Sequence, residues 1–173
     1  MSQIATFYTL SKDQSGLLLA AATPETKQVE KRFLYLFKKQ VEEQVDHFWD
    51  FVEEHATEQK HYPYSGAGFV QLDLLLEDKG CMLYDLGRCE LARTMSEARG
   101  ASIGVFGHSE AAATLAKLDE VGLSEADVRK YFQEDYPSED EDLGTEAVLA
   151  AFDICKTWMA SVGENEIGLL IVS

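Results

Sequence analysis

The chain has 173 residues, of which 46% are hydrophobic and 27% are charged, a composition typical of a folded globular protein. Its 31 acidic residues outnumber its 15 basic residues, so the formal net charge is −16. A charge of this sign and size repels phosphate groups, which excludes nucleic acid and an anionic membrane as expected partners and favours a basic protein.

The N-terminal segment from Ile4 to Leu10 is rich in aromatic and β-branched residues, a pattern that predicts a strand. Ser11 is expected to begin a short helix that ends near Ala22. The apolar run within this helix is far shorter than the roughly 20 residues that a membrane-spanning helix needs. The acidic Asp13 just before it also argues against a signal peptide.

A long helix is predicted from Pro24 to about Ala56. Thr23, Pro24 and Glu25 form a helix start signal, with a capping residue, a proline at the first helical position and an acid behind it. The apolar residues that follow recur mostly at steps of three and four, the period of one helical face. They are Val29, Phe33, Leu36, Val41, Val45, Phe48 and Val52.

The next segment, from His61 to Gly68, contains the proline and glycines typical of a loop. Apolar residues at the even positions from Val70 to Leu76 then alternate with Gln71 and Asp73, which favours a strand. The run is short, and a helix over residues 68–77 stays an open alternative.

The last part of the chain has clearer signals. A helix is expected to end at Gly100, and a strand follows over residues 101–106. Another helix should end near Gly122, and Ser124 and Asp127 have the spacing of a capping box that begins the next one. A further helix is predicted over residues 148–162.

The chain closes on an almost wholly apolar strand from Ile167 to Val172. Such a strand belongs in the interior of a sheet, because an exposed face would meet water. The sequence therefore predicts one α+β domain over residues 1–173, with a small mixed sheet that includes both terminal strands and is packed against several helices.

Four pieces of the sequence carry a resemblance to a known family. They are the opening MSQIATFYTLSKDQSGLLLA, the pair Asp46-x-x-Trp49, the segment LSEADVRKYF, and the final helix leading to an apolar C-terminal strand. Together they resemble the YfbM-like proteins, small bacterial α+β proteins of unknown function. The resemblance implies the fold and supplies no catalytic residue.

The segment GHSEA around Ser109 is similar to the nucleophile elbow of an α/β-hydrolase. That fold places its histidine after the serine, whereas all four histidines of this chain lie before Ser109. We therefore expect Ser109 to be a helix N-cap, with Glu110 in the first turn of the helix. A small-molecule hydrolase that uses Ser109 is the alternative hypothesis.

Metal binding is a second catalytic alternative. Glu58 and His61 have the spacing of one di-iron motif, but only one copy exists. His47 and His55 could bind zinc if another element supplied a ligand. The more economical interpretation is a solvated helix face, so neither a metal nor another cofactor is expected.

The loop KHYPYSGAGF offers a candidate binding surface, because loops often carry function and tyrosine is enriched at interfaces. His61, Tyr62 and Tyr64 are its candidate residues. A packed, structural role ranks above this one, because Tyr62, Tyr64 and Phe69 could equally pin the loop to the core.

The glycines Gly104 and Gly107 do not have the spacing of a phosphate-binding loop and are interpreted as sites of close packing or a turn. The three cysteines contain no CxxC pair, which suits reduced thiols in the cytoplasm. The overall prediction is an acidic, cytoplasmic, non-catalytic protein-interaction module.

Overall fold

A four-stranded sheet with the strand order β4-β1-β6-β5 lies at the centre of the computed structural model, which describes residues 3–33, 37–84, 89–136 and 140–173. Its strands are β1 (Ala5–Ser11), β4 (Ala56–Glu58), β5 (Ser102–Gly107) and β6 (Glu166–Val172). The predicted α+β class and the membership of both terminal strands are confirmed. The three pairings are antiparallel. Strands β1 and β5 run in the same direction, but β6 lies between them, so they do not pair with each other. The described sheet is therefore antiparallel and not mixed.

Strand β6 pairs with β1 on one side and with β5 on the other, as its apolar sequence predicts. Successive side chains of a strand point to opposite faces. Accordingly, Leu170 and Val172 belong to one buried cluster, whereas Leu169 and Ile171 belong to another. The two apolar faces of β6 thus hold two helical layers on the sheet.

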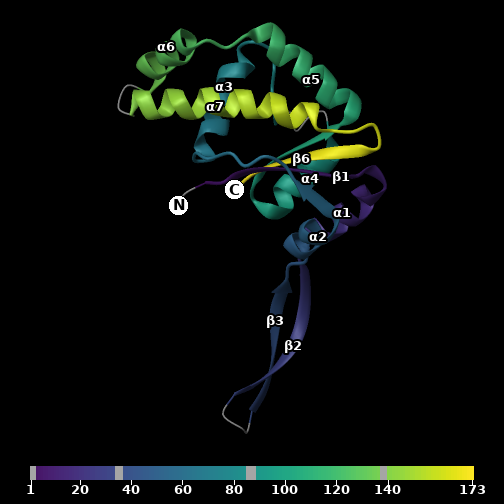
Figure 1. The fold of residues 1–173 in the computed structure, drawn as a ribbon. Coiled ribbons are helices and arrows are strands. Elements are labelled where there is room, and N and C mark those ends of the chain that lie inside the picture. The colour runs from purple at the N-terminus through teal and green to yellow at the C-terminus, as the bar shows by residue number, and fades with distance from the viewer. Residues whose placement is uncertain (1–2, 34–36, 85–88, 137–139) are drawn as a thin grey trace.

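The helices cover both faces of the sheet (Figure 1). One layer contains α3 (Ala67–Glu77), α5 (His108–Val121), α6 (Glu125–Asp135) and α7 (Glu141–Ala160). The opposite layer contains α1 (Ser15–Ala22), α2 (Phe48–His55) and α4 (Glu90–Arg99), with a short 3-10 turn η1 (Lys12–Gln14) before α1. None of the helices in the described residues is long and apolar enough to cross a membrane.

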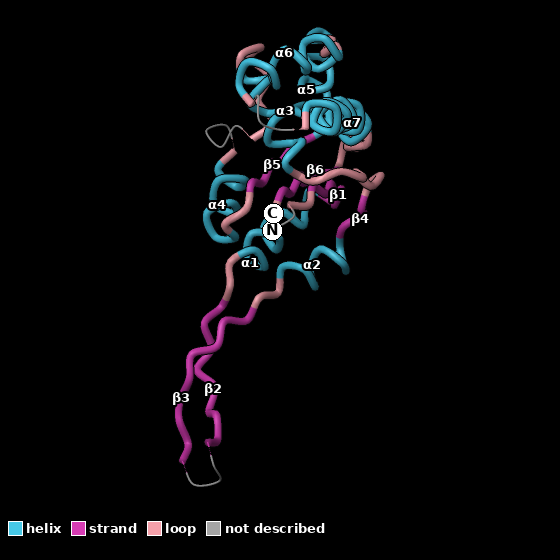
Figure 2. The backbone as a smooth tube through the Cα atoms, turned by 90° about the vertical axis from the view of Figure 1, so that its left-hand side faces the viewer, coloured by secondary structure: helices cyan, strands magenta, loops and turns pink. Residues whose placement is uncertain are grey.

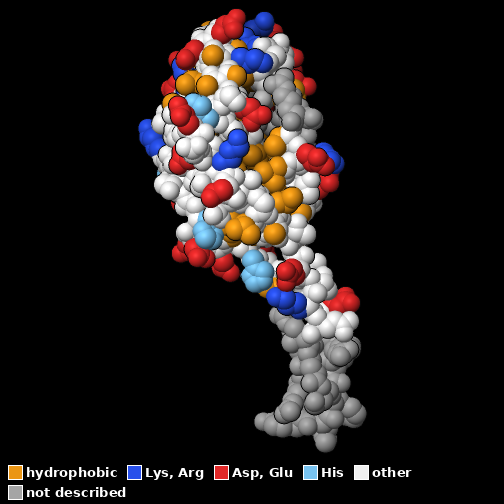
Figure 3. Space-filling view, turned by 90° about the vertical axis from the view of Figure 1, so that its right-hand side faces the viewer, with side chains coloured by type: hydrophobic (Ala, Val, Ile, Leu, Met, Phe, Trp, Pro, Cys, Tyr) orange, Lys and Arg blue, Asp and Glu red, His pale blue; other side chains and the backbone are white. Residues whose placement is uncertain are grey.

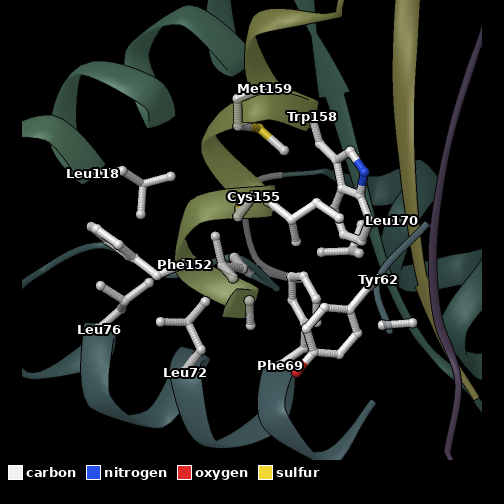
Figure 4. Packing of buried hydrophobic residues seen from close by; sticks show 14 of the residues in the cluster. Tyr62, Phe69, Leu72, Leu76, Leu118, Phe152, Cys155, Trp158, Met159 and Leu170 are labelled. Atoms are coloured by element: carbon white, nitrogen blue, oxygen red, sulfur yellow. The ribbon is translucent and has the colours of Figure 1, made fainter. Parts of the chain in front are cut away.

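The larger core lies between the sheet and α7, where Trp158, Phe69 and Tyr62 pack together with Leu170 (Figure 4). The Trp158 ring stacks on Phe7 at a centroid distance of 5.4 Å and on Phe69 at 5.1 Å. Its Nε1 donates a hydrogen bond of 2.8 Å to the carbonyl oxygen of Lys60. A strand, a helix and a loop are therefore joined through one side chain.

The predicted long helix from Pro24 to Ala56 is wrong. Its first two thirds form an antiparallel hairpin of β2 (Glu25–Phe33) and β3 (Phe37–Val45), which extends away from the sheet and its helices (Figures 1 and 2). Only its end is helical, as α2. Leu36, which was counted in the helical pattern, lies outside the described residues.

The error has a simple physical cause. A step of four residues is close to one helical turn, but it is also two full periods of a strand. Apolar residues four apart, such as Val29 and Phe33, therefore fit both structures. The backbone register places Val29 opposite Val41 in the hairpin, so two residues of the apparent helical stripe lie at facing positions of two strands.

An ion pair joins the base of the hairpin to the body. The Arg99 guanidinium donates hydrogen bonds of 2.7 and 2.8 Å to the two carboxylate oxygens of Asp46. These bonds, together with one from the Phe48 main chain, lower the pKa of Asp46 to about 2. The guanidinium carbon also lies 4.3 Å from the centre of the Phe48 ring. Arg99 thus links α4 to the start of α2.

The strand favoured over residues 70–76 is also wrong, because this segment belongs to the helix α3. Its buried residues follow helical steps: Gly68, Phe69, Leu72, Leu75 and Leu76. Alternation over seven residues that are mostly apolar does not discriminate between the two periods, as the open alternative allowed. Packing of α3 against α7 decides the outcome.

Several helix boundaries are confirmed. Gly100 and Gly122 end α4 and α5 with φ angles of +60° and +55°, values that favour glycine. Ser124 and Asp127 form the predicted capping box, with the Ser124 hydroxyl accepting from the Asp127 main chain at 3.2 Å.

Candidate functional site

A small pocket lies at the β5 edge of the sheet, where β5 pairs with β6 on one side and with no other described strand. Its volume is about 140 Å³. Consecutive β5 residues from both faces of the sheet line it, which places it at the edge rather than over either face. The lining residues of this β5 pocket are Cys81–Tyr84, Cys89, Ala92, Ile103–Phe106, Glu110, Ala113, Thr114 and Lys117.

Gly104 lets one wall of the pocket approach the strand. A Cβ atom at this position would lie 3.0 Å from the carbonyl oxygen of Leu83 and 2.9 Å from the Phe106 ring. The main-chain N–H of Leu83 in turn donates a hydrogen bond to Asp73 on α3. The segment from Cys81 to Tyr84 is therefore held close to β5, and the prediction that Gly104 permits close packing is confirmed.

At the outer edge of β5, one residue has a main-chain N–H and C=O for which the described residues provide no hydrogen-bond partner. Residues of an antiparallel strand alternate, with every second residue directing its N–H and C=O away from the neighbouring strand. Ile103 is such a residue, because its N–H donates to the Ser96 hydroxyl at 3.1 Å. Gly107 is another, because its N–H donates to the Glu110 carboxylate at 2.8 Å.

Val105 lies between these two residues, so its N–H and C=O also point outward. Within the described ranges of the chain, no hydrogen-bond partner is found for either group. Val105 lines the β5 pocket. The pocket wall therefore presents one hydrogen-bond donor and one acceptor, side by side on the same residue.

Two charged side chains border the pocket. The Glu110 carboxylate is engaged by the Gly107 main chain, and the Lys117 ammonium donates a hydrogen bond of 3.2 Å to the carbonyl oxygen of Gly80. Tyr84 also lines the pocket, and its buried hydroxyl has no hydrogen-bond partner among the described residues. Burial raises the pKa of this hydroxyl well above the ordinary value. The Tyr84 hydroxyl is therefore neutral at neutral pH. Glu110 contributes one negative charge to the pocket and Lys117 one positive charge.

Ser109 is placed differently from the prediction. The N-cap of α5 is Gly107, and Ser109 is the second residue of the helix, with an exposed side chain. The prediction that Glu110 lies in the first turn is correct, and its carboxylate completes the cap. The helix begins two residues earlier than predicted, and the Glu110 carboxylate, at the third helical position, accepts from the main-chain N–H of the N-cap Gly107.

The neighbouring His108 is hydrogen-bonded to another part of the chain. Its Nδ1 donates a hydrogen bond of 2.7 Å to the carbonyl oxygen of Val162, which turns this ring nitrogen toward the α7–β6 connection. In the described part of the chain, no hydrogen bond joins the Ser109 hydroxyl to a histidine.

The candidate metal ligands lie in four different places along the chain. His47 precedes α2, His55 ends it, Glu58 ends β4, and His61 lies in the following loop. The described residues contain no group of three or more His, Cys, Asp or Glu side chains arranged to hold a metal ion. The hairpin explains part of this, because His47 stands before α2 rather than inside one long helix.

The tyrosines of the 61–68 loop face the core. Tyr62 is 2% exposed, so its side chain lies in the core rather than on a binding surface, and its hydroxyl donates a hydrogen bond of 2.8 Å to the carbonyl oxygen of Ala147. Tyr64 is half-buried, with its ring centre 5.8 Å from that of Tyr62. His61 remains exposed. The loop is pinned to α7, which is the alternative that the sequence left open.

The fold and the pocket together define a class: an α+β protein with an antiparallel sheet between two helical layers and a small pocket at one sheet edge. No family model matches the sequence, and no curated protein matches it. Among solved structures, the chain is similar to YfbM from Escherichia coli, a protein of unknown function. The TM-score is 0.51, the sequence identity is 15%, and the match covers 98% of this chain and 99% of that chain. A YfbM-like fold is therefore confirmed, and at this identity the likeness shows the fold alone.

Proposed function

We propose that this chain is a non-catalytic binding protein that holds a ring-sized group of its ligand in the β5 pocket. The observation that carries the proposal is the unpartnered N–H and C=O of Val105 at the pocket wall, among the described residues. Apolar neighbours such as Leu83 and Phe106 surround this polar pair. Small-molecule sites combine the same two elements, an apolar lining and a few convergent polar groups.

The pocket size limits what can enter it. Its volume of about 140 Å³ is close to that of an engineered cavity of roughly 150 Å³ that holds one benzene molecule. Pockets for drug-sized ligands measure about 300–1,000 Å³. We therefore infer a ligand group the size of a single ring or one amino-acid side chain.

Phenol is a suitable probe, because it combines one ring with one polar group. On titration with phenol, the main-chain amide signals of Thr114 and Lys117 should shift in a two-dimensional NMR spectrum. Replacing Ala113 with phenylalanine should weaken phenol binding at least about tenfold, because Ala113 lines the pocket and its exposed position admits a larger side chain.

The matched control is Ala112→Phe. Ala112 is the adjacent exposed residue of α5, and it does not line the β5 pocket. Its replacement should leave phenol binding unchanged. Equal affinity in the two variants, or shifts confined to another part of the protein, would contradict the proposal.

The charge of the chain supports a second candidate partner, a basic protein. The net charge is −16, and acidic side chains are spread over the face shown in Figure 3 rather than gathered in one patch. Attraction through such a distributed field is screened by salt, because the Debye length falls from about 10 Å at 0.1 M to about 3 Å at 1 M. A partner captured at low salt should therefore be basic and should be released at high salt. An acidic partner, or one retained at high salt, would count against this role.

We further propose a cytoplasmic location, which the cysteines support. Cys81, Cys89 and Cys155 are not disulfide-bonded. Burial raises the pKa of the Cys155 thiol, which keeps it protonated and unreactive. Reduced, structural thiols are the usual state in that compartment.

A further inference from the structure

We infer that the group bound in the β5 pocket is a cyclic amide edge, meaning a ring in which an N–H lies next to a C=O, as in a lactam or a pyrimidine-type ring. The inference rests on the proposed function, because it assigns the ligand class of that same pocket. Some main-chain groups at the β5 edge are already hydrogen-bonded within the chain, and those that are not determine which ligand fits.

An open strand edge usually accepts another strand, through repeated main-chain pairs with an extended peptide. Here the two outward pairs that flank Val105 are engaged within the chain. The Ser96 hydroxyl bonds the N–H of Ile103, and the Glu110 carboxylate bonds the N–H of Gly107. An added strand would have to displace both side chains. The edge therefore offers the N–H and C=O of one residue, and not the repeated main-chain hydrogen bonds of a strand ladder.

A single outward pair has a definite chemical complement. The Val105 N–H needs an acceptor and its C=O needs a donor, and an extended residue holds the two on the same side. An amide whose N–H and C=O lie on the same side satisfies both groups at once. A ring enforces that arrangement, because an open-chain amide is almost always trans. The cavity of about 140 Å³ accommodates one such ring.

The side chains around the pocket agree with a neutral ligand of this kind. Glu110 and Lys117 contribute opposite charges, and each already has a main-chain partner. Two polar features of the lining stay without a partner among the described residues: the Val105 main-chain N–H and C=O, and the buried hydroxyl of Tyr84. Only Val105 presents a donor and an acceptor together on one strand edge. Leaving the Val105 N–H and C=O unpaired against a bound ring weakens binding, because each group loses its water without gaining a partner.

The test compares 2-piperidone with cyclohexanone. The two rings have nearly the same size and the same carbonyl group, but cyclohexanone has a methylene group in place of the N–H. Cyclohexanone is the more apolar of the two, so apolar burial alone would make it the tighter ligand. If Val105 recognises the amide edge, 2-piperidone should bind at least about tenfold tighter and should shift the Val105 amide signal.

A variant checks the donor on the protein side. The Val105 N–H is outside the β5–β6 ladder, and proline is tolerated at edge positions of this kind. Val105→Pro should therefore abolish the preference for 2-piperidone, while its thermal unfolding shows whether it has folded. If this variant does not fold, Ala113→Phe serves as the second variant and should lose binding of both rings.

The outcomes separate this inference from the proposed function. If both rings and phenol bind in the pocket but cyclohexanone binds as tightly as 2-piperidone, the ring-binding function stands and the amide recognition is overturned. If neither ring nor phenol shifts any signal of the pocket residues, both proposals fail.

Discussion

Replacing Trp158 with alanine is expected to lower the free energy of unfolding by about 3–5 kcal/mol, the range for removing a large aromatic side chain from a core. Trp158 is 1% exposed and stacks between Phe7 and Phe69. Its loss would empty the space between the sheet and α3 and leave the Lys60 carbonyl without its donor. Urea unfolding followed by circular dichroism measures the change directly.

Trp49 provides the matched control, because the chain has two tryptophans and Trp49 is 46% exposed. Its ring contacts Phe48 at a centroid distance of 5.0 Å but lies at the surface of α2. Trp49→Ala should therefore cost about 1 kcal/mol or less. Comparable losses in the two variants would show that Trp158 does not hold the core together.

The elements predicted correctly from the sequence have local signals that no tertiary contact overrides. Strand β6 is apolar at successive positions, which only an interior strand of a covered sheet tolerates. The capping box at Ser124 and the terminal glycine Gly100 are formed within a few residues of chain. In such cases residue type and spacing are sufficient.

The hairpin and α3 were missed because their apolar spacing fits two structures equally well. For α3, the helix is selected by contacts with α7, which lies more than sixty residues later in the chain by the numbering of the two elements. The pattern of residues along the chain does not show which distant helix α3 will contact. Residue patterns with a step of four should be weighed against the strand alternative whenever β-branched residues occupy them.

The β5 pocket shows the same limit for a site. Ser96, Val105 and Glu110 come from α4, β5 and α5, and only the fold brings them to one strand edge. The one local signal is Gly104 inside an apolar strand, a position that often marks a close approach of another backbone. The sequence singled out that glycine without indicating the pocket that it helps to form.

Adding a single methyl group at Gly68 is expected to destabilise the protein by about 2 kcal/mol, because overpacking and a broken buried hydrogen bond each cost about 1–3 kcal/mol and a gain in helix propensity offsets part of this. A Cβ atom at Gly68 would collide with the Tyr62 hydroxyl and lie 3.3 Å from the Ala147 carbonyl oxygen. These two groups form the hydrogen bond that holds the 61–68 loop on α7.

Gly16→Ala is the control for helix propensity. Gly16 also lies in a helix, α1, but no atom outside its own helix and chain neighbours lies within 4 Å of an added Cβ. Gly16→Ala should therefore raise the free energy of unfolding by about 0.5–1 kcal/mol. Opposite signs for one and the same substitution would show that contact between α3 and α7, rather than helix propensity, decides the structure of residues 67–77. A gain in stability at both positions would mean that Tyr62 does not lock these helices together.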